Sequence, residues 1–130
     1  MWKLNNRPSI LSPTLRAKKR YIAFHVISER KILLNDLINA IWQNTLNFLG
    51  ELGTSQSQLN VVKNLYNENN QTGLIKCSHL HVEQIRASLA LIQRIGDSRV
   101  LIKTLGVSGT IKAAQAKFFG EKDLASFIKT

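Results

Sequence analysis

The sequence predicts a single α+β domain: a four-stranded antiparallel sheet with two main helices, an extra C-terminal helix and a basic N-terminal arm. Its 130 residues suffice for one hydrophobic core and are too few for two. Of these residues 44% are hydrophobic, which excludes a wholly disordered chain. Short β-like segments also alternate with two amphipathic helical segments. We place the arm at residues 1–19 and the domain at residues 20–130.

The first strand is predicted at residues 20–29, directly after the arm. Residues 1–20 contain both prolines and six cations, without any acidic residue. In the strand, Ile22, Phe24 and Val26 share one face, and most residues between them are also apolar. A strand that is apolar on both faces is typical of the centre of a sheet.

A long amphipathic helix follows the first strand. Apolar side chains recur at three- and four-residue steps over residues 37–49, which is the spacing of one helix face. Asn35 or Asp36 is expected to cap the start of this helix. Gly50 and Gly53 are expected to end it.

A β-hairpin is predicted next, with strands at residues 59–66 and 74–78. The segment between them, residues 67–73, is rich in Asn and ends in Gly, which favours a longish turn. The second helix is predicted at residues 81–95, where apolar residues again recur at helical spacing. Gly96 is placed to end it in the left-handed conformation.

The fourth strand is predicted at residues 99–105, where Gly106 and Gly109 break it, and a further helix at residues 110–119. The order strand, helix, strand, strand, helix, strand is that of the ferredoxin-like split βαβ sandwich, in which the first and third strands are central. Its two helices cover one face only. The other face therefore needs the C-terminal helix, the arm or a partner protein to cover it.

The residues give little support to catalysis by the protein. The eight carboxylates are scattered singly along the chain, whereas a metal-dependent nuclease needs several that converge. Cys77, His79 and His81 would point the same way on an extended segment, but a structural zinc site needs a fourth ligand, and none is near in the sequence. We expect no catalytic residue and no metal site, and we favour simple packing for Cys77. A metal role for these three residues stays open.

The charge of the chain is its most informative property. Eighteen Lys and Arg against eight Asp and Glu give a net charge of +10, which favours a polyanionic partner, with nucleic acid as the first candidate. A membrane partner is not expected, because the cations do not line one amphipathic helix. We find no targeting segment, and the single cysteine fits a reducing compartment, so we expect a cytoplasmic protein.

Two sets of cations are expected to meet on one surface. One set surrounds the start of the first strand, and the other lies in the last strand and the helix after it, which neighbour the first strand in this fold. Together they are the predicted RNA-binding residues: Arg16, Lys18, Lys19, Arg20, Arg99, Lys103, Lys112 and Lys117. The third strand has no aromatic residue on which bases could stack, so we expect the protein to grip the RNA backbone and shape instead of reading bases.

Four segments, which span nearly the whole chain, carry a family resemblance: 11–24 (LSPTLRAKKRYIAF), 74–78 (LIKCS), 86–96 (RASLALIQRIG) and 99–114 (RVLIKTLGVSGTIKAA). Together they resemble the archaeal ribonuclease P protein component 2 family. The resemblance implies a noncatalytic, RNA-binding protein subunit of ribonuclease P, which removes the 5′ leader from precursor tRNA. In that family the RNA subunit carries the chemistry with bound magnesium, and the protein binds no cofactor.

The resemblance also implies partners and site residues. The implied partners are ribonuclease P RNA, protein component 3 and other protein subunits, with precursor tRNA reached through the holoenzyme. The cations in the matched segments are Arg16, Lys18, Lys19, Arg20, Lys103 and Lys112. The turn formed by Gly106, Ser108, Gly109 and Thr110 is expected to offer backbone N–H donors to a phosphate.

Two other functions remain open at this point. One is a free-standing RNA-binding or ribosome-associated protein, which would share the charge but need no protein partner. The other is a ligand-sensing domain of the same topology, which would dimerise through its sheet. The second has no need of so high a positive charge.

Overall fold

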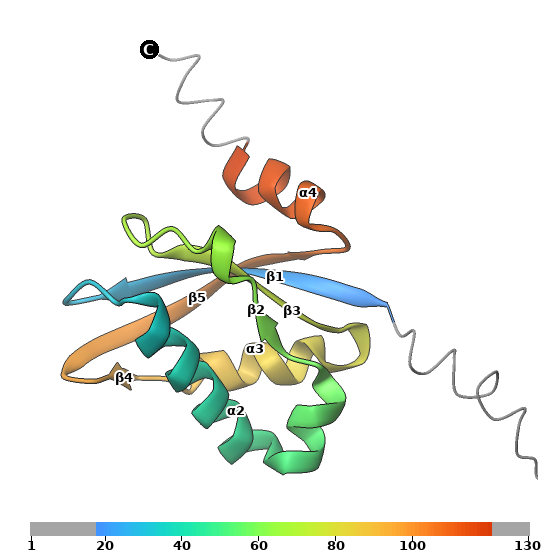
Figure 1. The fold of residues 1–130 in the computed structure, drawn as a ribbon, viewed down its shortest axis with the longest axis horizontal. Helices are drawn as coiled ribbons and strands as arrows, with labels where there is room; N and C mark the ends of the chain where they lie inside the picture. Colours follow the sequence, from blue (N-terminus) through green and yellow to red (C-terminus); the bar gives the residue numbers. More distant parts are fainter. Residues whose placement is uncertain (1–17, 121–130) are drawn as a thin grey trace, which may run out of the picture.

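The computed structural model describes residues 18–120, which form an antiparallel sheet with helices on both faces (Figure 1). Its long strands are β1 (Lys19–Ser28), β3 (Thr72–Ser78) and β5 (Ser98–Ser108). Two short strands, β2 (Asn60–Val61) and β4 (Arg94–Ile95), complete the order β2-β3-β1-β5-β4. The α+β class is confirmed, but the sheet has five strands instead of the four predicted. Residues 1–17 of the predicted arm and residues 121–130 lie outside the described range.

β1 lies at the centre of the sheet, as its apolar pattern predicted. It pairs antiparallel with β3 on one side and with β5 on the other. Ile22, Phe24 and Val26 point into the main core, and Ala23 on the opposite face is equally buried. Because β1 and β5 run in opposite directions, the start of β1 lies beside the end of β5.

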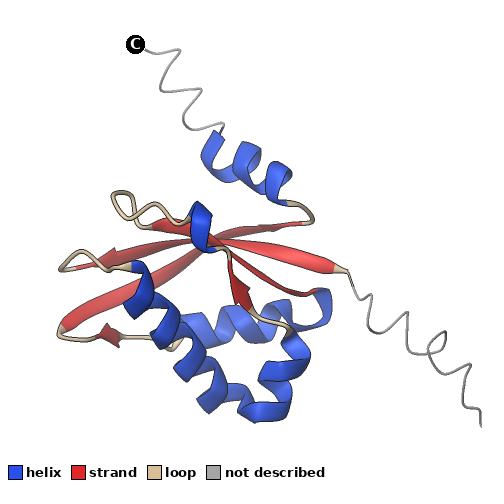
Figure 2. Cartoon of the chain, in the orientation of Figure 1, coloured by secondary structure: helices blue, strands red, loops and turns tan. Residues whose placement is uncertain are grey.

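Helices α2 (Leu34–Ser57) and α3 (Val82–Ala90) cover one face of the sheet (Figures 1 and 2). Their apolar stripes build the main core against β1, and the fully buried side chains of these helices include Leu37, Ile41, Ile85 and Leu89. Burial of such aliphatic side chains is worth about 1.5–3 kcal/mol each. None of the helices within residues 18–120 is both long and apolar enough to span a bilayer.

α2 differs from its prediction at both ends. It begins after Leu33 without a side-chain cap, so neither Asn35 nor Asp36 caps it. Asp36 instead lies in the first turn, where a negative charge interacts favourably with the helix dipole. Gly50 does not end the helix but kinks it, with φ 77° and ψ 176°, a conformation that glycine adopts most readily. The chain then continues helically to Ser57.

The predicted strand at residues 59–66 is shorter than expected. Only Asn60 and Val61 pair with β3, as β2. A short 3₁₀ turn, η1 (Lys63–Leu65), follows them. As an edge strand, β2 gains hydrogen bonds from one neighbour only, so little pairing holds the chain extended beyond Val61.

The second helix is also shorter than expected, because the last residues predicted for it form a short strand of the sheet instead. A 3₁₀ turn, η2 (His79–His81), precedes α3, which ends at Ala90. Residues 94–95 pair with the start of β5 as β4. Gly96, with φ 60°, and Asp97 form the two-residue turn between these strands, a position that requires left-handed backbone.

β5 runs through Gly106, which was expected to break it. The strand carries a bulge here, because Leu105 is an extra residue between the partners of Ala23 and Phe24. The ring of Phe118 lies so close to Gly106 that a Cβ at this position would overlap it. Gly106 therefore allows close packing within the strand and does not end it.

The face opposite α2 and α3 is partly covered by the C-terminal segment. This segment consists of α4 (Ile111–Ala114) and a π-helical turn, η3 (Gln115–Gly120) (Figure 2). Ala114 is fully buried against Ala23 and Leu74. At the other end of the same face, Ile27 and Leu101 stay 46% and 54% exposed. The prediction that this face needs cover is confirmed for the part under α4.

Candidate nucleic-acid interface

The start of β1 and the start of α4 bring cations together at one end of the sheet. Lys18, Lys19 and Arg20 lie where β1 begins, beside the end of β5. An ideal Cβ on Gly109, just after β5, would lie 4.0 Å from Arg20 Nη1. Lys112 lies in the first turn of α4, exposed to solvent. This part of the predicted convergence is present in the structure.

Two lysines at the same end were missed by the sequence prediction. Lys76 of β3 is directly opposite Tyr21 of β1. Cross-strand partners have Cβ atoms about 5 Å apart and share a face, so both side chains lie on the α4 side of the sheet. Lys63 of η1 lies across from them, and these three residues line one groove of about 380 Å³ together with Ile111. The sequence held one signal for this site, because Lys76 is the one charged residue of a central strand.

We call these six cations the cationic end: Lys18, Lys19, Arg20, Lys63, Lys76 and Lys112. Within residues 18–120, side-chain ion pairs form only between Arg86 and Glu83 and between Arg99 and Glu29. No described carboxylate therefore neutralises the cationic end. Unpaired cations gathered at one end of a rigid sheet are suited to binding phosphate groups.

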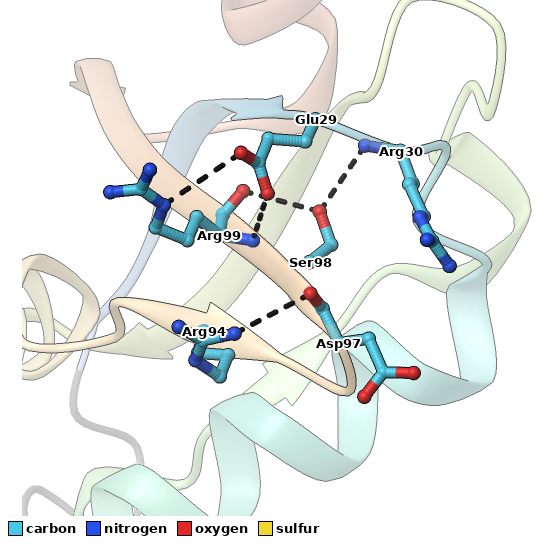
Figure 3. Close-up of polar contacts among 6 residues, drawn as sticks. All are labelled: Glu29, Arg30, Arg94, Asp97, Ser98 and Arg99. Atoms are coloured by element: carbon cyan, nitrogen blue, oxygen red, sulfur yellow. Dashed lines mark hydrogen bonds and ion pairs between the residues drawn. The ribbon is translucent and has the colours of Figure 1, made fainter.

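Arg99 does not join this surface. It lies at the opposite end of β1, where Glu29 contacts it (Figure 3). Its Nε is 3.7 Å from Glu29 Oε2, and its backbone N–H donates to Glu29 Oε1 at 3.2 Å. The neighbouring bonds are local too: the backbone N–H of Arg30 donates to Ser98 Oγ at 3.2 Å, and Arg94 Nη1 donates to the Asp97 carbonyl at 3.4 Å.

Two further predicted cations also lie away from the cationic end. Lys103 is opposite His25, in the middle of β1. Lys117 lies in η3, with its Nζ 5.8 Å from the centroid of the Phe118 ring. Arg16 lies outside the described residues. The expectation that all the cations form one surface is therefore wrong for Arg99 and Lys103, because an antiparallel strand spreads them along its length, and for Lys117, which lies after α4 in η3.

The predicted phosphate-contacting turn is shorter than expected. Gly106 lies within β5 against Phe118, and Ser108 is paired with Tyr21. Only Gly109 and Thr110 form the turn. The Thr110 hydroxyl accepts the backbone N–H of Ala113 at 3.0 Å, so it caps α4.

The predicted segment of Cys77, His79 and His81 does not bring its side chains together as ligands. Cys77 is buried in the core, and this burial raises the pKa of its thiol to about 11 against a smaller opposing effect of the Lys19 charge. His79 is exposed, and its Nδ1 lies 3.1 Å from the Lys18 carbonyl. No three His, Cys, Asp or Glu side chains of residues 18–120 lie in an arrangement that could hold a metal ion.

One family of known proteins matches this chain in sequence. The Rpp14/Pop5 family matches residues 20–119. Ribonuclease P protein component 2 of Pyrococcus furiosus is 45% identical over 118 residues, which cover 91% of this chain and 97% of that protein. The proteins of the same name from Thermococcus kodakarensis and Methanosarcina mazei are 41% and 40% identical, over 91% and 89% of this chain and 97% of each relative.

A solved structure shares the fold. One chain in the cryo-EM structure of yeast ribonuclease MRP superposes with a TM-score of 0.58, over 86% of this chain and 96% of that chain. Its sequence identity is 10%, so this likeness concerns the fold alone.

Proposed function

The chain belongs to the Rpp14/Pop5 family, and on that basis we propose that it is an RNA-binding protein subunit of ribonuclease P, which removes the 5′ leader from precursor tRNA. Its relatives at 40–45% identity are named ribonuclease P protein component 2. The cationic end carries the RNA-binding part of this proposal, because six cations share one end of the sheet without a described carboxylate partner.

The physical role we assign to the cationic end is neutralisation of phosphates. Lysines held on a sheet replace part of the counterion atmosphere and let crowded RNA helices approach one another. Each neutralised phosphate contributes about 0.7–0.9 to the slope of log affinity against log salt, so six contacts give a slope of about −4 to −5. Gly109 lies next to Arg20, and we include the backbone N–H groups of Gly109 and Thr110 in the proposal as further phosphate donors.

In this proposal the protein supplies no catalytic group. The RNA subunit, with its own magnesium, breaks the phosphodiester bond. The positions of the described carboxylates support this division, because Asp36 and Glu83 lie in first turns of helices and Glu29 pairs with Arg99. A nuclease site needs carboxylates that converge on metal ions.

The proposed partners are ribonuclease P RNA, protein component 3 and the other protein subunits, with precursor tRNA reached through the holoenzyme in the cytoplasm. The exposed Ile27 and Leu101 support a protein partner on the part of the sheet that α4 leaves open. We also interpret the scaffold as ferredoxin-like with one addition. Without the two-residue β4, the order β2-β3-β1-β5 with two helices on one face is that arrangement.

The test is a salt titration of RNA binding by Lys63→Ala/Lys76→Ala. Two lost phosphate contacts reduce the slope by about 1.4–1.8, so between 50 and 200 mM salt the variant loses roughly tenfold less affinity than wild type. Arg30→Ala/Lys31→Ala is the matched control, because it removes the same charge from exposed positions after the far end of β1. An unchanged slope in the first variant, with normal thermal stability, would reject the assignment.

Reconstitution tests the assembly. Precursor tRNA processing by the RNA subunit and its partner proteins should depend on this chain, and Lys63→Ala/Lys76→Ala should need more magnesium for the same rate, because divalent ions replace the lost charge. If omission of the chain leaves processing unchanged at all magnesium concentrations, the proposed function is wrong.

A further inference from the structure

A second cavity on the α4 side of the sheet has the chemistry of a base-binding pocket. It lies past the end of α4, between η3, the middle of β1 and the loop before β3, and has a volume of about 390 Å³. Its polar and aromatic lining consists of His25, Asn67, Asn70, Thr72, Gln115 and Phe119. It is more enclosed than the groove beside Lys76, and no carboxylate lines it.

The lining of the pocket combines flat apolar surface with hydrogen-bond donors and acceptors. Phe119 and two leucines supply the apolar surface. The carboxamides of Asn70 and Gln115 each present donors and an acceptor, which can match the Watson–Crick edge of a base. Neither carboxamide has a side-chain partner within residues 18–120, and both residues are exposed at the rim.

One polar group of the pocket is already held in place. Asn67 Oδ1 accepts the backbone N–H groups of Asn69 and Asn70, at 2.9 and 3.1 Å. These two bonds fix the loop and leave the amide nitrogen of Asn67 available. The pocket wall is therefore preorganised on this side, which lowers the entropic cost of binding.

Two cations neighbour lining residues of this pocket, one across the sheet and one along the chain. Lys103 is the cross-strand partner of His25 and shares its face of the sheet, with its side chain exposed. Lys117 is exposed two residues before Phe119. These are two of the cations that do not join the cationic end. Two positive charges beside an aromatic pocket without a carboxylate favour a nucleotide over an apolar protein segment.

We propose that this cavity receives one unpaired nucleobase of the RNA, with Lys103 and Lys117 on the flanking phosphates. The proposal rests on the proposed function, since the nucleotide belongs to the RNA that the protein binds. It also changes one expectation from the sequence. The strands lack a stacking platform, but Phe119, which comes after the sheet, supplies an aromatic ring from outside it.

Asn70→Ala/Gln115→Ala tests the pocket without changing charge. The two exposed side chains make no hydrogen bonds within the described part of the chain, so the fold should be unaffected. Gln43→Ala/Asn47→Ala is the matched control, because it removes the same two amides from the exposed face of α2. The RNA probes are the ribonuclease P RNA subunit and the same RNA substituted with 4-thiouridine, and heparin is a polyanion that has no bases.

The pocket variant should bind the RNA subunit roughly tenfold more weakly, which is the loss expected for two hydrogen bonds, at an unchanged salt slope. Its affinity for heparin should equal that of wild type. Crosslinks from 4-thiouridine should map to residues 67–72 or 115–119 and disappear in the variant. The control should behave as wild type throughout.

Several outcomes would overturn the proposal. Equal RNA affinity of the pocket and control variants would reject the pocket while leaving the proposed function intact. A loss of binding to protein component 3 without a loss for RNA would assign the cavity to a protein partner. If wild type does not bind the RNA subunit at all, both proposals fail together.

Discussion

Replacing Gly106 by alanine tests how α4 is held on the sheet. The added Cβ would overlap Cζ and Cε1 of Phe118, so either the ring leaves its place or the strand shifts at the bulge. Gly109→Ala is the matched control, because its Cβ would meet only Arg20 Nη1, at 4.0 Å, an ordinary van der Waals contact. Neither glycine has a positive φ, so backbone strain does not separate the two variants.

The expected cost follows from the contacts that the Phe118 ring loses. Truncating a fully buried phenylalanine costs about 3–5 kcal/mol, and the half-buried Phe118 should give about 2 kcal/mol for Phe118→Ala. Gly106→Ala displaces the same ring, so we expect a similar loss of about 2 kcal/mol. Gly106→Ala and Phe118→Ala both remove the same contact, that of the Phe118 ring with the backbone at Gly106. Their costs should therefore not add in the double variant, which should also lose about 2 kcal/mol.

Urea unfolding followed by circular dichroism measures the stability of wild type and of the four variants. The midpoint should fall in Gly106→Ala and in Phe118→Ala, stay close to wild type in Gly109→Ala, and fall no further in the double variant. Gly106→Ala should also weaken RNA binding, because α4 carries Lys112 and leads to Phe119. If Gly106→Ala is as stable as Gly109→Ala, or if the two costs add in full, the packing we describe does not hold α4.

The remaining predictions concern two side chains in or beside the core, Cys77 and Tyr66, and one surface ion pair. Burial raises the pKa of Cys77 to about 11, so at pH 8 its alkylation by iodoacetamide should be more than about a hundredfold slower than in urea; equal rates would contradict its burial. Burial, and then the charge of Glu68, raise the pKa of Tyr66 to about 12. The phenolate absorbance of a Tyr21→Phe variant should therefore titrate near pH 12, and not near 10. Because the folded protein keeps this proton longer than the unfolded chain, the stability from Tyr66 is present below pH 10 and is lost as the pH rises towards 12. Tyr66→Phe, which removes a 2.9 Å hydrogen bond to the Ile32 carbonyl, should accordingly cost about 1 kcal/mol at pH 8 and less at pH 11. Glu29→Gln should change stability by less than about 0.5 kcal/mol, because both side chains of its pair with Arg99 are mostly exposed; a loss above about 1 kcal/mol would contradict this weak role.

The sequence correctly predicted the elements whose residue pattern favours one kind of secondary structure. The two-sided apolar pattern of residues 20–29, which is rich in β-branched and aromatic residues, favours a central strand, and β1 is central. Gly96 was misplaced because a helix end and a two-residue hairpin both need a left-handed residue. Ile92 and Ile95 are buried, as the helical pattern required, but they reach the core from β4 and the segment before it.

The candidate site was predicted in part, because charge is visible in a sequence and position along a strand is not. Lys18, Lys19 and Arg20 lie at the start of β1, where the chain after β5 arrives. Arg99 was grouped with them because β5 neighbours β1, but antiparallel pairing puts it at the other end. Lys63 and Lys76 were missed because they are far from Tyr21 in the sequence. Only the folding of the sheet brings η1 and β3 next to Tyr21.

The single extra residue at Leu105 gives the α4 side of the sheet two consecutive residues of β5. Ile102 and Val107 both pack towards the main core although they are five residues apart, an odd spacing that an unbroken strand would put on opposite faces. Between them, Leu105 joins the cluster under α4 and Gly106 lies against Phe118, so both residues of the bulge face away from the main core. Without Leu105, Ile102 and Val107 would be four residues apart and would still face the core. The bulge therefore adds a leucine to the surface on which α4 rests and leaves the core side of β5 as a regular strand would have it.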